Sequence, residues 1–205
     1  MNSIFFIRSL VLVNINFDLG NPPELEKCFS AYKSAILNNK GEDAVKYLDS
    51  HSMDYFTMIL EKVQGADSLA VEALSLSDKF NVLVIRHLAT KKDILAFTPA
   101  TMTAFAFNNG MGGQTNLEAS TLGKAKIKGN NAKAFLMVDG KKTNTEYEFN
   151  LEDGQWKIDI TASMAKAETE MKDMLQGKDE NEFIFVMLEL MNGKVPTNSI
   201  WKKIK

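Results

Sequence analysis

Apolar side chains at helical spacing follow residue 20. Six of them recur every three or four residues, which places them on one face of an amphipathic helix: Leu25, Cys28, Phe29, Tyr32, Ala35 and Ile36. Asn21 and Pro22 predict the start of this helix, and Gly41 predicts its end. The pattern then predicts a short helix over residues 42–48 and a third helix that Ser52 caps.

The apolar run FNVLVIRHL, residues 80–88, fits a buried helix and a buried strand equally well by its periodicity. Signals on both sides of the run favour a helix. Ser77 is a suitable N-cap, and Thr90 with Asp93 has the form of a capping box that begins the next helix. We therefore expect helices through residues 66–109.

Beyond residue 120 the apolar pattern changes to alternation, which is typical of strands. The segment KAKIK, residues 124–128, alternates with Ala125 and Ile127 facing inward. The segment KAFLMV, residues 133–138, is apolar on both faces, so we expect it to be covered on both sides.

The stretch YEFNLEDGQWKID, residues 147–159, predicts a β-hairpin. Asp153 and Gly154 form the preferred dipeptide for a two-residue type I′ turn, and that turn fixes which residues face each other. Glu148 then faces Asp159 on a polar face. Every apolar residue meets an apolar residue on the other face, which consists of Tyr147, Phe149, Leu151, Trp156, Ile158 and Ile160.

Two further helices, over residues 162–176 and 180–192, and a tail with Trp201 end the chain. The predicted fold class is α+β, with N-terminal helices packed on a curved, cone-like antiparallel sheet and a helical C-terminal extension. Residues 21–160 are expected to form the α+β domain, and residues 161–205 the extension packed on it.

Residues 1–20 are apolar and fit either a β-strand or a degenerate export leader. Arg8 interrupts the apolar run, and no small-residue cleavage site follows it. A cytoplasmic location is favoured, and export is expected only if these residues act as a leader. No stretch of the sequence reaches the roughly 18 apolar residues that a membrane-spanning helix needs.

The charges are balanced, with 24 Lys and Arg against 26 Asp and Glu and a net charge of −2. This balance predicts no nucleic-acid partner. Cys28 is the only cysteine and falls on an apolar helical stripe, which is typical of a buried thiol. His51 and His87 have no metal-ligand spacing, and GMGGQTN at residues 110–116 lacks the strand and helix that a phosphate-binding loop needs. We therefore expect no metal and no cofactor.

Two groups remain as candidate chemistry. Glu148 and Asp159 form a paired-carboxylate site if their face is enclosed, and a mixed-charge sheet surface if lysines from neighbouring strands share that face. Arg86 lies inside an apolar run, where a guanidinium needs a partner. We expect an ion pair between helices, with binding of an acidic ligand as the alternative.

Two segments resemble the nuclear transport factor two-like superfamily, which includes ketosteroid isomerase and polyketide cyclases. These are CFSAYKSAILNNKGEDAVKYLD, residues 28–49, and YEFNLEDGQWKIDI, residues 147–160. The resemblance implies a cone with a pocket between the first helix and the concave sheet. Tyr32 matches the position of the oxyanion-donor tyrosine of ketosteroid isomerase, but the expected general base is missing, since Asp54 falls in a predicted helix.

The leading hypothesis is a non-enzymatic module of this superfamily that binds an apolar or amphipathic small molecule or a protein partner, and the resemblance also leads us to expect a homodimer. The alternatives are a pocket enzyme of the isomerase, dehydratase or cyclase type, and an accessory protein whose C-terminal helices plug the cone. The candidate ligand-binding residues are Tyr32, Phe149, Trp156 and Arg86, and no catalytic residue is assigned.

Overall fold

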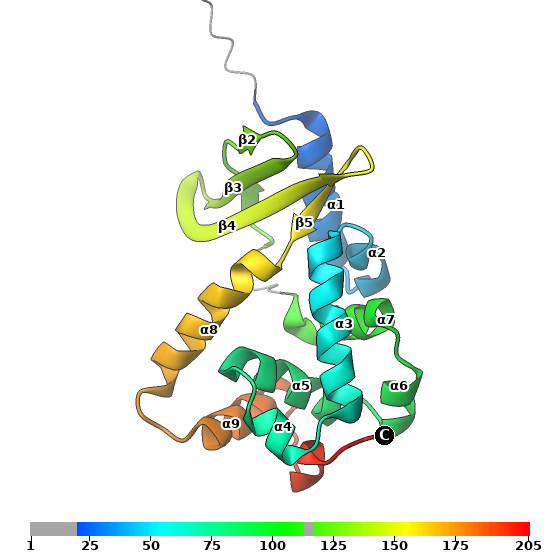
Figure 1. The fold of residues 1–205 in the computed structure, drawn as a ribbon. Coiled ribbons are helices and arrows are strands. Elements are labelled where there is room, and N and C mark those ends of the chain that lie inside the picture. The colour runs from blue at the N-terminus through cyan, green and yellow to red at the C-terminus, as the bar shows by residue number, and fades with distance from the viewer. Residues whose placement is uncertain (1–19, 113–116) are drawn as a thin grey trace, which may run out of the picture.

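A computed structural model describes residues 20–112 and 117–205 of the chain. In it, helices pack against a curved antiparallel sheet, which confirms the α+β class predicted from the sequence (Figure 1). The strand or leader predicted over residues 1–20 lies outside the described residues apart from Gly20, and so do residues 113–116 of the GMGGQTN segment.

Helices precede and follow the sheet. Before it come α1 (Pro23–Leu37), α2 (Gly41–Val45), α3 (Ser50–Gly65), α4 (Ser68–Glu72), α5 (Leu76–Leu88), α6 (Lys91–Ala96), α7 (Pro99–Ala106) and the π-helical turn η1 (Phe107–Met111). After it come α8 (Thr161–Leu175), α9 (Glu180–Asn192) and the 3-10 turn η3 (Asn198–Trp201). Figure 1 shows α1 against the sheet at one end of the molecule and α4, α5 and α9 at the other, with α3 and α8 running between them.

The strands of the sheet are β1 (Ser120–Leu122), β2 (Lys126–Lys128), β3 (Asn131–Val138), β4 (Lys141–Glu152) and β5 (Gln155–Asp159). Their order is β1-β3-β4-β5, with β2 beside β3, and every pairing is antiparallel. The register of β3 against β4 shifts between Phe135 and Met137, an irregularity that bends paired strands. Ala134 and Leu136 are buried, whereas Phe135 and Met137 are only half-buried. The prediction that this strand is covered on both sides is therefore wrong, since β3 is fully covered on one face only.

The hairpin of β4 and β5 has the predicted register. Glu148 pairs with Asp159, and Phe149 with Ile158. The backbone φ angles of Asp153 and Gly154, 49° and 75°, are both positive, as a type I′ turn requires. Phe149 and Ile158 are completely buried, so this face of the hairpin forms part of the core.

The second edge of β5 is held by the link between α2 and α3. The Ile158 N–H donates to the Tyr47 carbonyl (2.7 Å), and the Asp49 N–H donates to the Ile158 carbonyl (3.0 Å). The Asp49 carboxylate, 1% exposed, accepts from the Ser52 N–H (2.8 Å) and from the side-chain amide of Asn150 (2.7 Å). Asp49, and not Ser52 as predicted, therefore caps α3 and joins it to β4 and β5.

Other helix boundaries also differ from the predictions. The helix over residues 80–88 is confirmed as part of α5, but its cap is Ser75 instead of Ser77. Gly41 begins α2 and does not end α1. A Cβ at Gly41 would lie 2.2 Å from the carbonyl oxygen of Ala104, so the close approach of α2 to α7 requires glycine.

Two predicted positions near the sheet are corrected as well. Asn21 does not cap α1, because its side chain accepts from the Ala125 N–H (2.6 Å) and donates to the Gly123 carbonyl (2.9 Å). Ile127, expected to face inward, is 45% exposed, since β2 is a three-residue edge segment whose side chains are all exposed.

The buried guanidinium of Arg86 joins α5 to α3 and to the C-terminal tail. It donates to the carbonyl oxygens of Val63 (2.9 Å), Lys62 (2.9 Å), Ala66 (2.7 Å) and Ile200 (3.0 Å). Lys62 and Val63 lie at the C-terminal end of α3, and Ala66 is its C-cap, so three of the four carbonyls lie where a cation is favoured. The expected ion pair is therefore replaced by backbone acceptors, and no carboxylate in the described residues pairs with Arg86.

Replacing Arg86 by Met should lower the free energy of unfolding by about 3 kcal/mol, because four carbonyls lose a charged donor in a buried site. Arg86→Lys should lose nearly as much, since an ammonium lacks the planar fork that reaches all four oxygens. Urea denaturation measures both. The control is Lys91→Met at an exposed position, which should change the free energy of unfolding by less than about 0.5 kcal/mol. An equally small change in Arg86→Met would show that Arg86 does not hold these segments together.

Candidate ligand pocket

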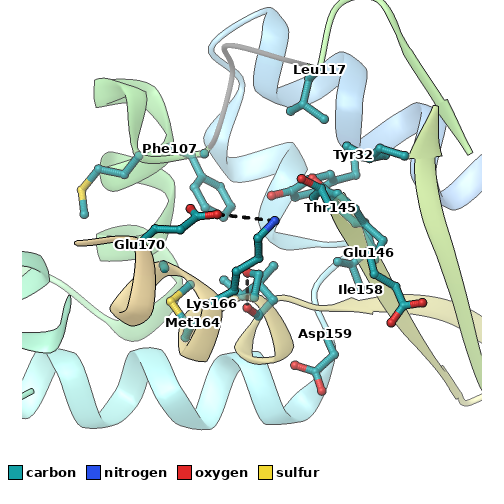
Figure 2. A pocket seen from close by; sticks show the side chains of 17 residues that line it. Tyr32, Phe107, Leu117, Thr145, Glu146, Ile158, Asp159, Met164, Lys166 and Glu170 are labelled. Atoms are coloured by element: carbon teal, nitrogen blue, oxygen red, sulfur yellow. Dashed lines mark hydrogen bonds and ion pairs between the residues drawn. The ribbon is translucent and has the colours of Figure 1, made fainter. Parts of the chain in front are cut away.

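A pocket of about 370 Å³ lies between α1, the sheet, η1 and α8 (Figure 2). This volume falls within the range of about 300–1,000 Å³ that is usual for ligand sites. Its apolar and aromatic walls come from Tyr32 of α1, Phe107 and Met111 of η1, Leu117, Leu136 of β3, Tyr147 of β4, Ile158 of β5, Ile160, and Met164 and Ala167 of α8.

Local structure explains why these side chains converge. Thr145 and Tyr147 are two residues apart on β4, so both point to the same face of the sheet. Met164 and Ala167 are three residues apart on α8, which places them on one helical face. The chain passes from β5 into α8 at Ile160, so α8 extends from the sheet along the side of the pocket.

Aromatic rings join α1 to the sheet and to η1 at the base of the pocket. The ring centroids of Tyr32 and Phe107 lie 6.1 Å apart at 84°, and those of Tyr32 and Tyr147 lie 6.5 Å apart at 64°. Phe29 packs edge-on against Tyr147 at 5.4 Å. These edge-to-face contacts fix the ring positions.

Three hydroxyl groups that line the pocket have no hydrogen-bond partner within the described residues. They belong to Tyr32, Thr145 and Tyr147. Burial raises the pKa of Tyr147 to about 12, and burial together with the neighbouring Tyr147 raises the pKa of Tyr32 well above 10.0. Both phenols are therefore protonated donors at physiological pH.

Two charged groups of the pocket, Lys166 and Glu170, lie at its rim. The Lys166 ammonium donates to the Asn144 carbonyl (2.9 Å). It also lies 3.5 Å from the Glu170 carboxylate. Figure 2 shows the pair of Lys166 and Glu170. The side chains of Lys166 and Glu170 are 42% and 61% exposed. Their pairing leaves little net charge at this side of the opening.

Glu148 and Asp159, the candidate carboxylate pair, each bond to a different partner. Glu148 forms an ion pair with Lys133, its neighbour on β3, and is partly exposed. Asp159 accepts from the Thr161 N–H (2.8 Å) and hydroxyl (2.6 Å). Asp159 borders the pocket, but its carboxylate points away from Tyr32 (Figure 2).

Ligand atoms of Asp49, His51 and Asp159 lie within 4.8 Å of one another, a spacing that a metal site needs. Sequence spacing did not reveal this group, because Asp159 comes from a distant strand. Asp49 uses both carboxylate oxygens for hydrogen bonds, and the exposed His51 ring lies 3.8 Å from Asp159. Capping and turn formation explain these carboxylates, so we assign no metal to them.

Among the four candidate ligand-binding residues, Tyr32 lines the pocket. Phe149 is completely buried, Trp156 is half-buried against the core, and Arg86 is enclosed by carbonyl groups. None of these three is part of the pocket lining. Cys28 is buried, and its pKa is raised to about 12 mainly by that burial, which agrees with an unreactive core thiol.

Sequence reasoning missed Thr145, Lys166 and Glu170. The alternation of β4 gave a usable signal for Thr145, which shares a face with Tyr147. No signal marked Lys166 or Glu170, because the sequence does not show which face of α8 lies along the pocket.

Comparison of the chain with protein-family models, with curated proteins and with solved structures gave no match. In the part of the chain that the structure describes, no helix is both long and apolar enough to cross a membrane.

The helix that forms the pocket wall has few buried side chains. Leu175 is the one buried residue of α8, so polar contacts contribute much of its attachment. The Glu168 carboxylate accepts from the Ser77 N–H (2.7 Å) and the Leu76 N–H (3.3 Å) at the start of α5, and it pairs with Lys172 at 2.8 Å. Burial opposes ionisation of Glu168, but these contacts outweigh it and lower its pKa to about 2.

We expect Glu168→Gln to lower the free energy of unfolding at pH 7 by about 1–2 kcal/mol, because a charged acceptor at a helix N-terminus is lost. A carboxyl whose folded pKa is depressed stabilises the fold above its unfolded pKa, near 4.5, and this contribution is lost as the pH falls toward 2. The difference between wild type and variant should therefore shrink below about pH 5 in urea denaturation. Asp173→Asn, at an exposed position of α8, is the control, and a difference that stays constant down to pH 2 would contradict this role.

Proposed function

We propose that this chain is a non-enzymatic module that binds an apolar or amphipathic small molecule in the pocket between α1, the sheet and α8. The observation that carries the proposal is the pocket itself, with apolar walls and a few polar groups that converge on it. Its volume suits a small ligand. The proposal includes membership of the nuclear transport factor two-like superfamily, which would place a pocket between the same two elements.

The polar groups around the pocket argue against a pocket enzyme. Proton transfer needs an acid or base within hydrogen-bond reach of the reacting group. Asp159 is engaged by Thr161, and Glu170 is engaged by Lys166 at the exposed rim. The Glu146 carboxylate points away from Tyr32 (Figure 2). Asp54 is exposed on α3 and does not line the pocket. Within the described residues, Tyr32 therefore has no free carboxylate aimed at it.

The plugged-cone alternative also has little support. It expects side chains of the C-terminal helices to fill the cavity, such as Met171, Phe183 or Trp201. These three pack partly buried against the core and are not among the lining residues. The C-terminal extension instead contributes a wall through Met164 and Ala167.

Filling the pocket tests this function. We expect wild type to bind N-phenyl-1-naphthylamine, an uncharged apolar dye, with a rise in dye fluorescence. Ala167→Phe should weaken dye binding at least tenfold, because the added ring occupies the cavity from the α8 wall. Fluorescence titration measures the dissociation constants.

The matched control is Ala165→Phe, which adds the same ring two residues away at an exposed position of α8. This variant should bind the dye like wild type. If Ala167→Phe and Ala165→Phe bind the dye equally, or if wild type shows no saturable dye binding, the pocket is not a ligand site.

A further inference from the structure

One side of the pocket carries hydroxyl groups on otherwise apolar walls. We call Tyr32, Thr145 and Tyr147 the hydroxyl cluster. Tyr32 comes from α1, and the other two come from the same face of β4. The rings of Tyr32 and Tyr147 are in edge contact, with centroids 6.5 Å apart, so the cluster joins the two elements that enclose the site.

The cluster has unused hydrogen-bonding capacity. Tyr32 is only 2% exposed, yet neither its hydroxyl nor those of Thr145 and Tyr147 have a partner in the described chain. Among the described residues, Asn181 Oδ1 is the one fully enclosed side-chain nitrogen or oxygen without a partner. The three hydroxyl oxygens are therefore not fully enclosed, and they open onto the pocket that their residues line. Hydroxyls that open onto a cavity pair with whatever occupies it, water or ligand. An acceptor that enters the pocket would replace water as their partner.

The surroundings of the cluster indicate the charge of that acceptor. Both phenols stay protonated, so the cluster presents neutral donors. Lys166 is the one cationic side chain among the described lining residues, and Glu170 and the Asn144 carbonyl already occupy it. Glu146 and Asp159 add further negative charge to the lining. An anionic group would therefore be desolvated without a free cation to pair with.

A cationic group is not favoured either. It needs a carboxylate beside it once water is removed. Asp159 is held by Thr161, and Glu170 is 61% exposed at the rim. The Glu146 carboxylate points away from Tyr32 (Figure 2). The cluster itself offers only neutral oxygens.

We propose that the hydroxyl cluster binds an uncharged oxygen acceptor at the polar end of an apolar ligand. This inference rests on the proposed function and specifies the class of molecule that the pocket takes. Tyr32, Thr145 and Tyr147 contact the oxygen, while the apolar walls contact the rest of the ligand. Lys166 and Glu170 remain paired when the ligand binds.

The test uses three molecules with the same chain length and different heads: 1-octanol, octanoate and octylammonium. Each is titrated against the full chain loaded with N-phenyl-1-naphthylamine, and displacement of the dye is followed by fluorescence. We expect 1-octanol to displace the dye at a concentration at least tenfold lower than either ion. Tyr147→Phe and Thr145→Val each remove one hydroxyl with little change in shape, and each should weaken 1-octanol about fivefold.

Because the dye contains no oxygen, both variants should bind it like wild type, which shows that the pocket is intact. Tyr47→Phe, which removes a phenol hydroxyl outside the pocket lining, should leave octanol binding unchanged. The inference would be overturned, while the proposed function stands, by either of two results. One is that octanoate displaces the dye at the same concentration as 1-octanol. The other is that both hydroxyl variants bind 1-octanol with wild-type affinity. Failure of the wild type to bind the dye would instead overturn the proposed function, and this inference with it.

Discussion

The arrangement of the molecule depends on how β5 is held along both of its edges. One edge pairs with β4 in a register fixed by the Asp153–Gly154 turn, and the other is bound by the backbone between α2 and α3. Asp49 links these contacts, because its N–H bonds to β5 while its buried carboxylate caps α3 and accepts from β4. An edge strand secured in this way cannot slip by one residue without turning its apolar face to solvent.

The pocket follows from that constraint. Since α8 begins directly after β5, fixing β5 fixes the origin of the pocket wall. The middle of α8 is attached to the start of α5 through Glu168, and α5 is joined to α3 and the C-terminal tail through Arg86. Three charged side chains, Asp49, Arg86 and Glu168, therefore connect the sheet end to the helical end. Each of them bonds to at least one backbone group of another segment or helix end.

The sequence was informative where one local rule determines the outcome. The hairpin register, the capping box at Thr90 and the limits of α9 follow from turn chemistry and helical spacing, and the structure confirms them. It failed where distant segments meet. Gly41 is needed for contact with α7, Arg86 finds carbonyls, and Ile127 lies on an uncovered edge. The same limit applies to the pocket: helical spacing marked Tyr32, but the α8 side chains opposite it carry no local signal.

The proposed function requires a small apolar ligand to occupy the space between Tyr32, the sheet and α8. Methionines report on it directly, because Met111 and Met164 line the pocket whereas Met58 and Met187 do not. In a protein with ¹³C-labelled methionine methyl groups, titration with 1-octanol should shift the Met111 and Met164 signals saturably and leave those of Met58 and Met187 in place. Unchanged Met111 and Met164 signals, or shifts confined to methionines outside the pocket, would contradict the account.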